Sequence, residues 1–164
     1  MKVKTLGNKE KPAILMIPGM FCTGEMPERA ARFLEKDFFM ILPTLDGHHA
    51  EEPVYHDKQA DGQKIVSWLH ENRIEKLALL QGTSMGAEVA LETARQLDIP
   101  VSRYLFDGGP FFCFPRPVRA VMAMKFMSYM KTVKGKENDQ AIRELMKDPF
   151  VKGSAETRWI PIGI

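Results

Sequence analysis

A serine flanked by two glycines constrains this chain more than any other feature. Gly82, Ser84 and Gly86 occupy alternate positions, after an apolar run at residues 77–80 and before a helix-prone run at residues 87–92. A strand that turns directly into a helix needs small residues at both corners, and the serine between them is held in a strained conformation with its hydroxyl exposed. The pattern therefore predicts a strand–turn–helix corner that presents Ser84.

The elements around this corner are predicted to alternate between strand and helix. Patterns with helical spacing predict helices at residues 27–36, 57–72 and 84–97, and short apolar runs predict strands at residues 3–6, 13–17, 39–42, 77–80 and 101–106. Glycine and asparagine at positions 7 and 8 predict a hairpin-like connection between the first two strands. The alternation predicts an α/β fold with a mostly parallel sheet flanked by helices.

Three segments resemble the α/β-hydrolase-fold serine hydrolases. Residues 82–86 resemble the nucleophile elbow of that family, and residues 13–20 resemble the strand and loop that supply the second oxyanion donor, with Pro18 where a histidine is common. Residues 39–48 resemble the following strand and its Asp-x-x-Gly-His-type ending, shortened by two residues. The resemblance covers residues 1–110 and implies an α/β-hydrolase fold, truncated at its C-terminal side.

The same resemblance implies a catalytic serine and an oxyanion hole. Ser84 would be the nucleophile, and the amides of Met85 and Met20 would be the two oxyanion donors. Asp107 ends the predicted strand after the elbow and is a candidate triad acid, although an aspartate before Gly-Gly-Pro is also ordinary turn chemistry. The alternative for Ser84 is that it only caps the helix that follows.

The histidines depart from the family pattern. In such enzymes the acid and the histidine follow the nucleophile in chain order, whereas His48, His49, His56 and His70 all precede Ser84. A solvent-exposed or loop-ordering role is expected for the first two, in preference to a general base. No triad histidine is evident, so the chain is expected to be either a truncated hydrolase or one with abnormal chemistry.

The sequence changes character beyond residue 110. A stripe rich in Met and Phe at residues 118–130 predicts an amphipathic helix, and a second helix is expected at residues 138–146. In the family such an insertion resembles a lid over the active site, while packing into a core is an equally open interpretation. We therefore expect a hydrolase core at residues 1–110 and a helical, lid-like segment at residues 111–164. An acyl pocket or a core plug would explain the aromatic cluster Phe111, Phe112 and Phe114.

The expected function is hydrolysis of a carboxylic ester or thioester with a small apolar acyl group, through an acyl-Ser84 intermediate. Acyl transfer to an acceptor other than water stays open. The alternative that is not an enzyme is a non-catalytic fragment that binds a small ligand or a protein through the same pocket. The outer edge of the strand at residues 101–106 is expected to lack a partner strand, which favours self-association.

Composition narrows the classes of partner. The net charge is +2 over 164 residues, and the short basic clusters lie beside acidic residues, so no nucleic-acid partner is expected. No apolar run is long enough to span a bilayer or to form a signal peptide, which predicts a cytoplasmic protein without a membrane span. Cys22 and Cys113 make no disulfide framework, and no Cys/His spacing suggests a metal, so no cofactor is expected.

Overall fold

The computed structural model describes residues 1–49, 51, 54–111 and 114–133. The chain divides into two compact units, of which the first comprises Met1–Phe111 and the second contains helix α4 (Arg116–Val133). The predicted Met-rich helix is therefore present as α4. The helix predicted at residues 138–146 lies outside the described residues.

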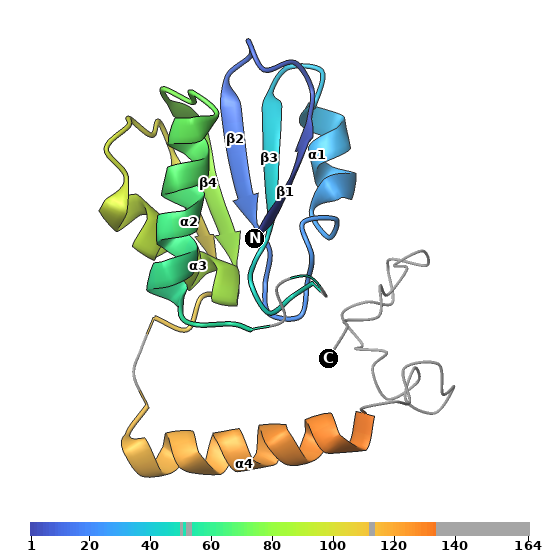
Figure 1. The fold of residues 1–164 in the computed structure, drawn as a ribbon, viewed down its shortest axis with the longest axis vertical. Coiled ribbons are helices and arrows are strands. Elements are labelled where there is room, and N and C mark those ends of the chain that lie inside the picture. Colours follow the sequence, from blue (N-terminus) through green and yellow to red (C-terminus); the bar gives the residue numbers. More distant parts are fainter. Residues whose placement is uncertain (50, 52–53, 112–113, 134–164) are drawn as a thin grey trace. The chain divides into compact units, whose positions relative to one another are not determined.

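A five-stranded sheet in the order β1-β3-β2-β4-β5 forms the centre of the first unit (Figure 1). Its strands are β1 (Lys2–Leu6), β2 (Ala13–Ile17), β3 (Phe39–Thr44), β4 (Leu77–Thr83) and β5 (Tyr104–Asp107). Strands β3, β2, β4 and β5 run parallel to one another, and β1 pairs antiparallel with β3. The mostly parallel sheet is thus confirmed.

The predicted hairpin-like connection between the first two strands is wrong. Strand β1 pairs with β3, from Lys2 opposite Thr44 to Leu6 opposite Met40, and both edges of β2 are occupied by β3 and β4. Gly7 does reverse the chain, with a φ of 80°. Turn residues set where the chain reverses, but the choice of neighbouring edge is made by long-range pairing.

Three helices cover the sheet, and their positions match the predictions to within a few residues. Helix α1 (Glu28–Leu34) lies on one face, while α2 (Lys58–Glu71) and α3 (Met85–Gln96) lie on the other (Figure 1). Asp57 caps α2 as expected, because its carboxylate accepts the Ala60 N–H at 2.8 Å. Helix α1 is shorter than predicted and begins after Pro27.

The core consists of two apolar layers, one on each face of the sheet. The larger layer joins the sheet to α2 and α3 and includes Leu15, Ile17, Ile41, Ile65, Leu69, Leu80 and Val89. The smaller layer lies on the face of α1 and consists of Ile14, Ala31, Met40 and Leu42 with their half-buried neighbours. A parallel sheet buried on both faces produces the continuous apolar strands seen in the sequence.

The last strand begins later than predicted. The regular ladder of β5 starts at Tyr104, and Val101 makes only an isolated parallel bridge to Leu77. Between them, the carbonyl of Arg103 still accepts the Leu80 N–H at 3.0 Å. Strand β5 is the terminal strand of the sheet, so one of its edges has no partner strand in the part of the chain that the structure describes.

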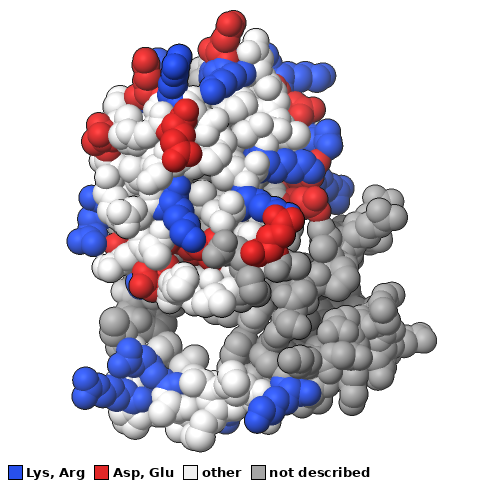
Figure 2. All heavy atoms as spheres, viewed as in Figure 1, with Lys and Arg blue, Asp and Glu red and all other residues white. Residues whose placement is uncertain are grey.

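Charges of both signs are interspersed over the first unit in Figure 2, whereas the charged residues of α4 are all Lys or Arg. Ion pairs account for several charges of the first unit, including Lys4 with Glu28 at 2.6 Å and Lys58 with Glu88 at 2.9 Å. Within the described ranges, no helix combines the length and the apolar character that a bilayer crossing requires. Nor do these ranges contain a group of three or more His, Cys, Asp or Glu side chains that could hold a metal ion.

Candidate active site

The predicted strand–turn–helix corner is present at the carboxyl end of β4. Ser84 separates Thr83, the last residue of β4, from Met85, the first of α3, and has a φ of 54° and a ψ of −123°. A methyl group on Gly82 would overlap the backbone of Gly86, and one on Gly86 would overlap the carbonyl oxygens at the end of β2. Glycine is therefore required at both positions because strand and helix approach too closely for a side chain.

The hydroxyl of Ser84 is exposed and is not engaged in capping. Ser84 occupies the N-cap position of α3, yet its side chain makes no capping hydrogen bond. Its backbone N–H donates to the carbonyl oxygen of Asp107 at 2.7 Å, which ties the corner to β5. Ser84 thus holds the N-cap position of α3 without using its hydroxyl as a cap.

The loop after β2 lies directly against this corner. A methyl group on Gly19 would be 3.4 Å from Ser84 Cβ and 4.0 Å from Ser84 Oγ. The loop turns back at once, because the Cys22 N–H donates to the Gly19 carbonyl at 3.2 Å, and Phe21 has a φ of 63°. Positive φ at a residue with a side chain is strained, and such strain concentrates at functional sites.

The two residues predicted as oxyanion donors belong to the two segments that meet here. Met85 is buried and opens α3, so its amide is one of the first-turn N–H groups that find no acceptor within a helix. Met20 follows Gly19 and is 47% exposed. The structure therefore brings the segments that contain Met20, Ser84 and Met85 together at the carboxyl ends of β2 and β4.

Asp107 lies beside the corner at the end of β5, opposite Thr83 in the sheet register. Its carbonyl oxygen accepts the N–H of Ser84, while its carboxylate is exposed and makes no hydrogen bond or ion pair with any described residue. Gly108 follows with a φ of 61°, as the turn interpretation of this segment requires. The carboxylate of Asp107 could therefore accept a hydrogen bond from another group near Ser84, and no described residue donates one to it.

His48 is buried, and its environment is that of a loop-ordering residue. Its Nδ1 donates to the carbonyl oxygen of Asp46 at 2.8 Å, which leaves Nε2 as the acceptor in the neutral ring. The ring lies near Phe21, at 6.5 Å between centroids, and near Tyr55, at 6.4 Å. His48 therefore connects the loops that follow β2 and β3.

The other histidines do not reach Ser84 through any hydrogen bond between described residues. His70 pairs with Asp98 at 2.8 Å, beyond the C-terminal end of α3. Because a helix of this length spans roughly 18 Å, that pair lies far from the corner at the N-terminus. Burial, reinforced by the N-terminal amine, lowers the pKa of His49, and His56 is exposed.

A buried charge cluster that follows β3 was not predicted. Asp46, at the end of β3, pairs with the N-terminal amine at 2.7 Å and with Lys64. Burial alone would raise the pKa of Asp46, but the hydrogen bonds from Lys64 and the N-terminal amine lower it. Burial also acts on Asp61, whose carboxylate accepts the Asp46 N–H, and raises its pKa to about 6. The helical spacing of Asp61 with Ile65 was a sign that this carboxylate faces the core.

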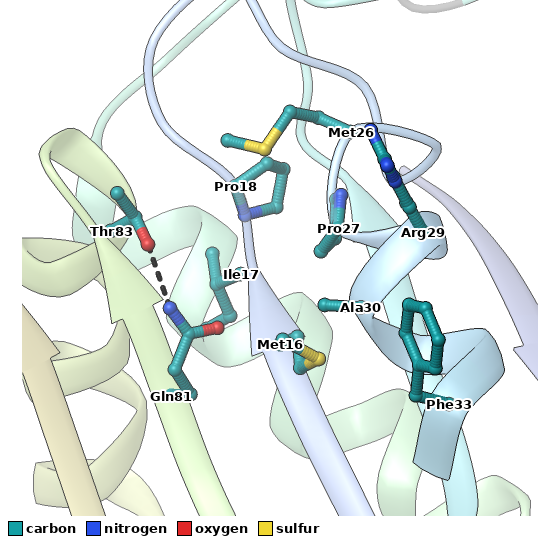
Figure 3. Close-up of a pocket in the computed structure, with 10 residues that line it drawn as sticks. All are labelled: Met16, Ile17, Pro18, Met26, Pro27, Arg29, Ala30, Phe33, Gln81 and Thr83. Carbon is teal, nitrogen blue, oxygen red and sulfur yellow. Dashed lines mark hydrogen bonds between the residues drawn. The ribbon is translucent and has the colours of Figure 1, made fainter. Parts of the chain in front are cut away.

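A cavity of about 460 Å³ opens on the face of the sheet that carries α1 (Figure 3). Gln81 and Thr83 of β4 line it and are joined by a hydrogen bond of 2.7 Å. Pro18 lines it too. Pro18 and Thr83 directly precede Gly19 and Ser84 in the chain, so the cavity adjoins the corner. The remaining lining is Met16, Ile17, Met26, Pro27, Arg29, Ala30 and Phe33.

The predicted aromatic cluster is described only in part. Phe111 packs edge-to-face on Phe106, with 6.0 Å between ring centroids, and Phe112 lies outside the described residues. Phe114 is exposed. Cys22 is half-buried, and burial raises the pKa of its thiol, which disfavours the reactive thiolate.

Comparison with solved structures identifies the fold. An α/β-hydrolase family protein from Desulfitobacterium hafniense matches 82% of this chain at 26% identity and a TM-score of 0.72. A hydrolase from Pseudomonas aeruginosa PA01 matches 96% at 16% identity and a TM-score of 0.72, and MenH from S. aureus matches 94% at 16% identity and a TM-score of 0.69. Neither protein-family models nor curated proteins give a match.

The chain has the α/β-hydrolase fold, as the sequence resemblance implied. It spans about half the length of these neighbours, since the aligned region covers 54%, 58% and 59% of the three structures.

Proposed function

We propose that this chain carries the nucleophile and the oxyanion donors of a hydrolase that cleaves a carboxylic ester or thioester with a small apolar acyl group. The observation that supports the proposal is the exposed, uncommitted hydroxyl of Ser84 on a strained corner between β4 and α3. Two of the three neighbours named above are described as hydrolases, and other structures similar to this chain are described as carboxylesterases and as epoxide hydrolases, which supports hydrolase chemistry in general.

In the proposed reaction, Ser84 Oγ attacks the acyl carbon and the leaving alcohol or thiol departs, so that an acyl-Ser84 ester forms and water then hydrolyses it. Negative charge develops on the acyl oxygen during each attack. The amides of Met85 and Met20 donate to that oxygen, and the partial positive charge at the N-terminus of α3 adds to them. Loss of one such donor typically lowers the rate by about 100- to 1000-fold.

The described residues provide no evident general base for Ser84. We assign the acid of the triad to Asp107, whose backbone already bonds to Ser84, but no described histidine bridges the two. A serine without its histidine retains about 1000- to 10,000-fold acceleration over water, which comes from the oxyanion hole and from binding. We therefore expect Ser84 in this chain to react slowly.

Three further assignments belong to the same proposal. Residues 1–110 act as the hydrolase core, and residues 111–164, which include the Met-rich α4, act as a lid-like segment that adapts to the acyl group. The apolar lining of a lid suits an apolar substrate. The protein works in the cytoplasm.

An active-site-directed fluorophosphonate tests the proposal directly, with intact mass as the readout. We expect slow labelling of one site, abolished in Ser84→Ala and unchanged in Ser102→Ala, an exposed serine outside the corner. Rapid stoichiometric labelling would show that the chain has a working base. Absence of labelling at alkaline pH, in a folded protein, would refute the nucleophile assignment.

The cavity favours a second candidate, a non-catalytic domain that binds a small apolar molecule. Its volume of about 460 Å³ falls in the range of small-molecule sites, and its lining is mostly apolar. Fluorescence titration with an apolar dye would test this. Met16→Gln should weaken dye binding, whereas Leu91→Gln on the exposed side of α3 and Ser84→Ala should not. Equal binding by all three variants would exclude the cavity as the site.

A further inference from the structure

The free edge of β5 is built for pairing with another strand. In the β4–β5 ladder, the carbonyls of Arg103 and Asp107 accept N–H groups from the β4 side. Because backbone groups alternate along a strand, Leu105 also turns its N–H and C=O toward β4. Tyr104 and Phe106 consequently direct their N–H and C=O groups to the outer edge, where no described strand receives them.

The side chains of β5 leave apolar surface exposed on both faces of that edge. Tyr104 is 50% exposed and stacks on Phe106, with 6.0 Å between ring centroids, on the face that carries α3. Leu105 is 52% exposed and lies on the opposite face, since side chains alternate along a strand. Edge strands of folded proteins are often protected by proline or a bulge, and β5 contains neither; its charges are Asp107 and the flanking Arg103.

The geometry points to a second copy of this chain as the occupant, paired antiparallel through β5 about a two-fold axis at Leu105. In this register, Tyr104 of one copy faces Phe106 of the other, and the two residues exchange both of their backbone hydrogen bonds. The axis repeats this pair, so that four outward-directed N–H groups and four carbonyls are satisfied at once. Leu105 then faces its own copy in a pair without hydrogen bonds.

Charge complementarity selects this register and this orientation. Arg103 and Asp107 flank the three central residues and are both exposed. In the antiparallel pair, Arg103 of each copy lies opposite Asp107 of the other, whereas a parallel pair in register would place like charges side by side. Opposite charges across strands contribute about 0.2–1 kcal/mol per pair, and like charges destabilise by a similar amount. The interface thus joins two aromatic pairs, one leucine pair and two ion pairs.

The first test is disulfide trapping in a Cys22→Ala, Cys113→Ala background. Directly opposed residues in a pair without hydrogen bonds have Cα atoms about 4.5 Å apart, which lies within the range for a disulfide. Leu105→Cys should therefore form a covalent dimer under mild oxidation. Arg103→Cys, two residues from the axis on the same strand, and Leu91→Cys on α3 should not. Equal trapping of all three, or none at Leu105→Cys, overturns the register.

Sedimentation of the 164-residue chain between about 1 and about 200 μM provides the second test. We expect a reversible dimer whose dissociation constant rises at least about tenfold in Arg103→Glu and returns toward the starting value in Arg103→Glu, Asp107→Lys. Leu91→Lys is the control for added surface charge. A monomer throughout this range, with a native circular-dichroism spectrum, overturns the proposal, as does a dimer that the Arg103 substitution leaves unchanged.

Discussion

Replacing Ser84 by glycine should stabilise the fold while removing the proposed nucleophile. Ser84 has a φ of 54° and a ψ of −123°, a combination that a residue with a Cβ rarely adopts. Strain of this kind costs about 1–3 kcal/mol at a residue with a side chain and is absent for glycine. Glycine also makes the unfolded chain more flexible, which costs about 0.4–1 kcal/mol. The net expectation is a gain of about 1 kcal/mol.

Ser84→Ala is the matched control because it removes the hydroxyl but keeps the Cβ. The hydroxyl makes no hydrogen bond in the described structure, so the free energy of unfolding of Ser84→Ala should stay within about 0.5 kcal/mol of the starting protein. Neither variant should react at position 84 with a fluorophosphonate. The pair therefore separates loss of chemistry from relief of strain.

The assay is urea denaturation followed by far-ultraviolet circular dichroism, at one fixed protein concentration since association would add to the apparent stability. A gain of about 1 kcal/mol corresponds to a rise in Tm of about 3 °C for a chain of this size. If the corner stored no strain at Ser84, the glycine variant would be less stable than the alanine variant by about 0.4–1 kcal/mol, the entropic cost of glycine alone. The strained-elbow explanation of the exposed Ser84 hydroxyl would then fail.

Three further predictions concern residues around the corner. Gly86→Ala should destabilise the fold by about 1–3 kcal/mol or more in urea denaturation, because its methyl group meets backbone carbonyls at the end of β2 that cannot move aside. The control is Gly108→Ala, whose methyl group meets no atom within 4 Å and should cost only the strain of its backbone conformation. Equal costs for the two variants would contradict this packing argument. Gly19→Ala should leave the free energy of unfolding nearly unchanged, since the contacts of its methyl group at 3.4 Å are ordinary. The same variant should slow fluorophosphonate labelling by about tenfold, because the methyl group lies beside Ser84. An unaltered labelling rate would place the acyl site elsewhere. Burial raises the pKa of Asp61 to about 6, so ionisation of this carboxyl is penalised in the folded state. Its contribution to the free energy of unfolding is absent below pH 4, and stability falls as the pH rises from 4 to 6. Asp61→Asn should remove that fall, and a stability–pH profile identical to that of the starting protein would refute the prediction.

Features that depend on neighbours in the chain could be predicted from the sequence. The corner at Ser84 follows from two glycines between an apolar run and a helical pattern, and the N-cap of α2 follows from Asp57 at its start. Both are local, because the atoms in contact are separated by a few residues. The resemblance to α/β hydrolases rests on such local motifs in order, and it led to the correct fold.

Only the tertiary structure decided which edges pair and which polar groups are buried together. The pairing of β1 with β3 depends on β4 occupying the other edge of β2, and no turn signal near Gly7 contains that information. The Asp61 carboxylate accepts the backbone N–H of Asp46 although the two residues are 15 apart in the chain. Burial raises the pKa of Asp61, whereas hydrogen bonds from Lys64 and the N-terminal amine lower the pKa of Asp46. Chain reversal and capping are short-range effects, whereas edge selection and desolvation are properties of the assembled sheet.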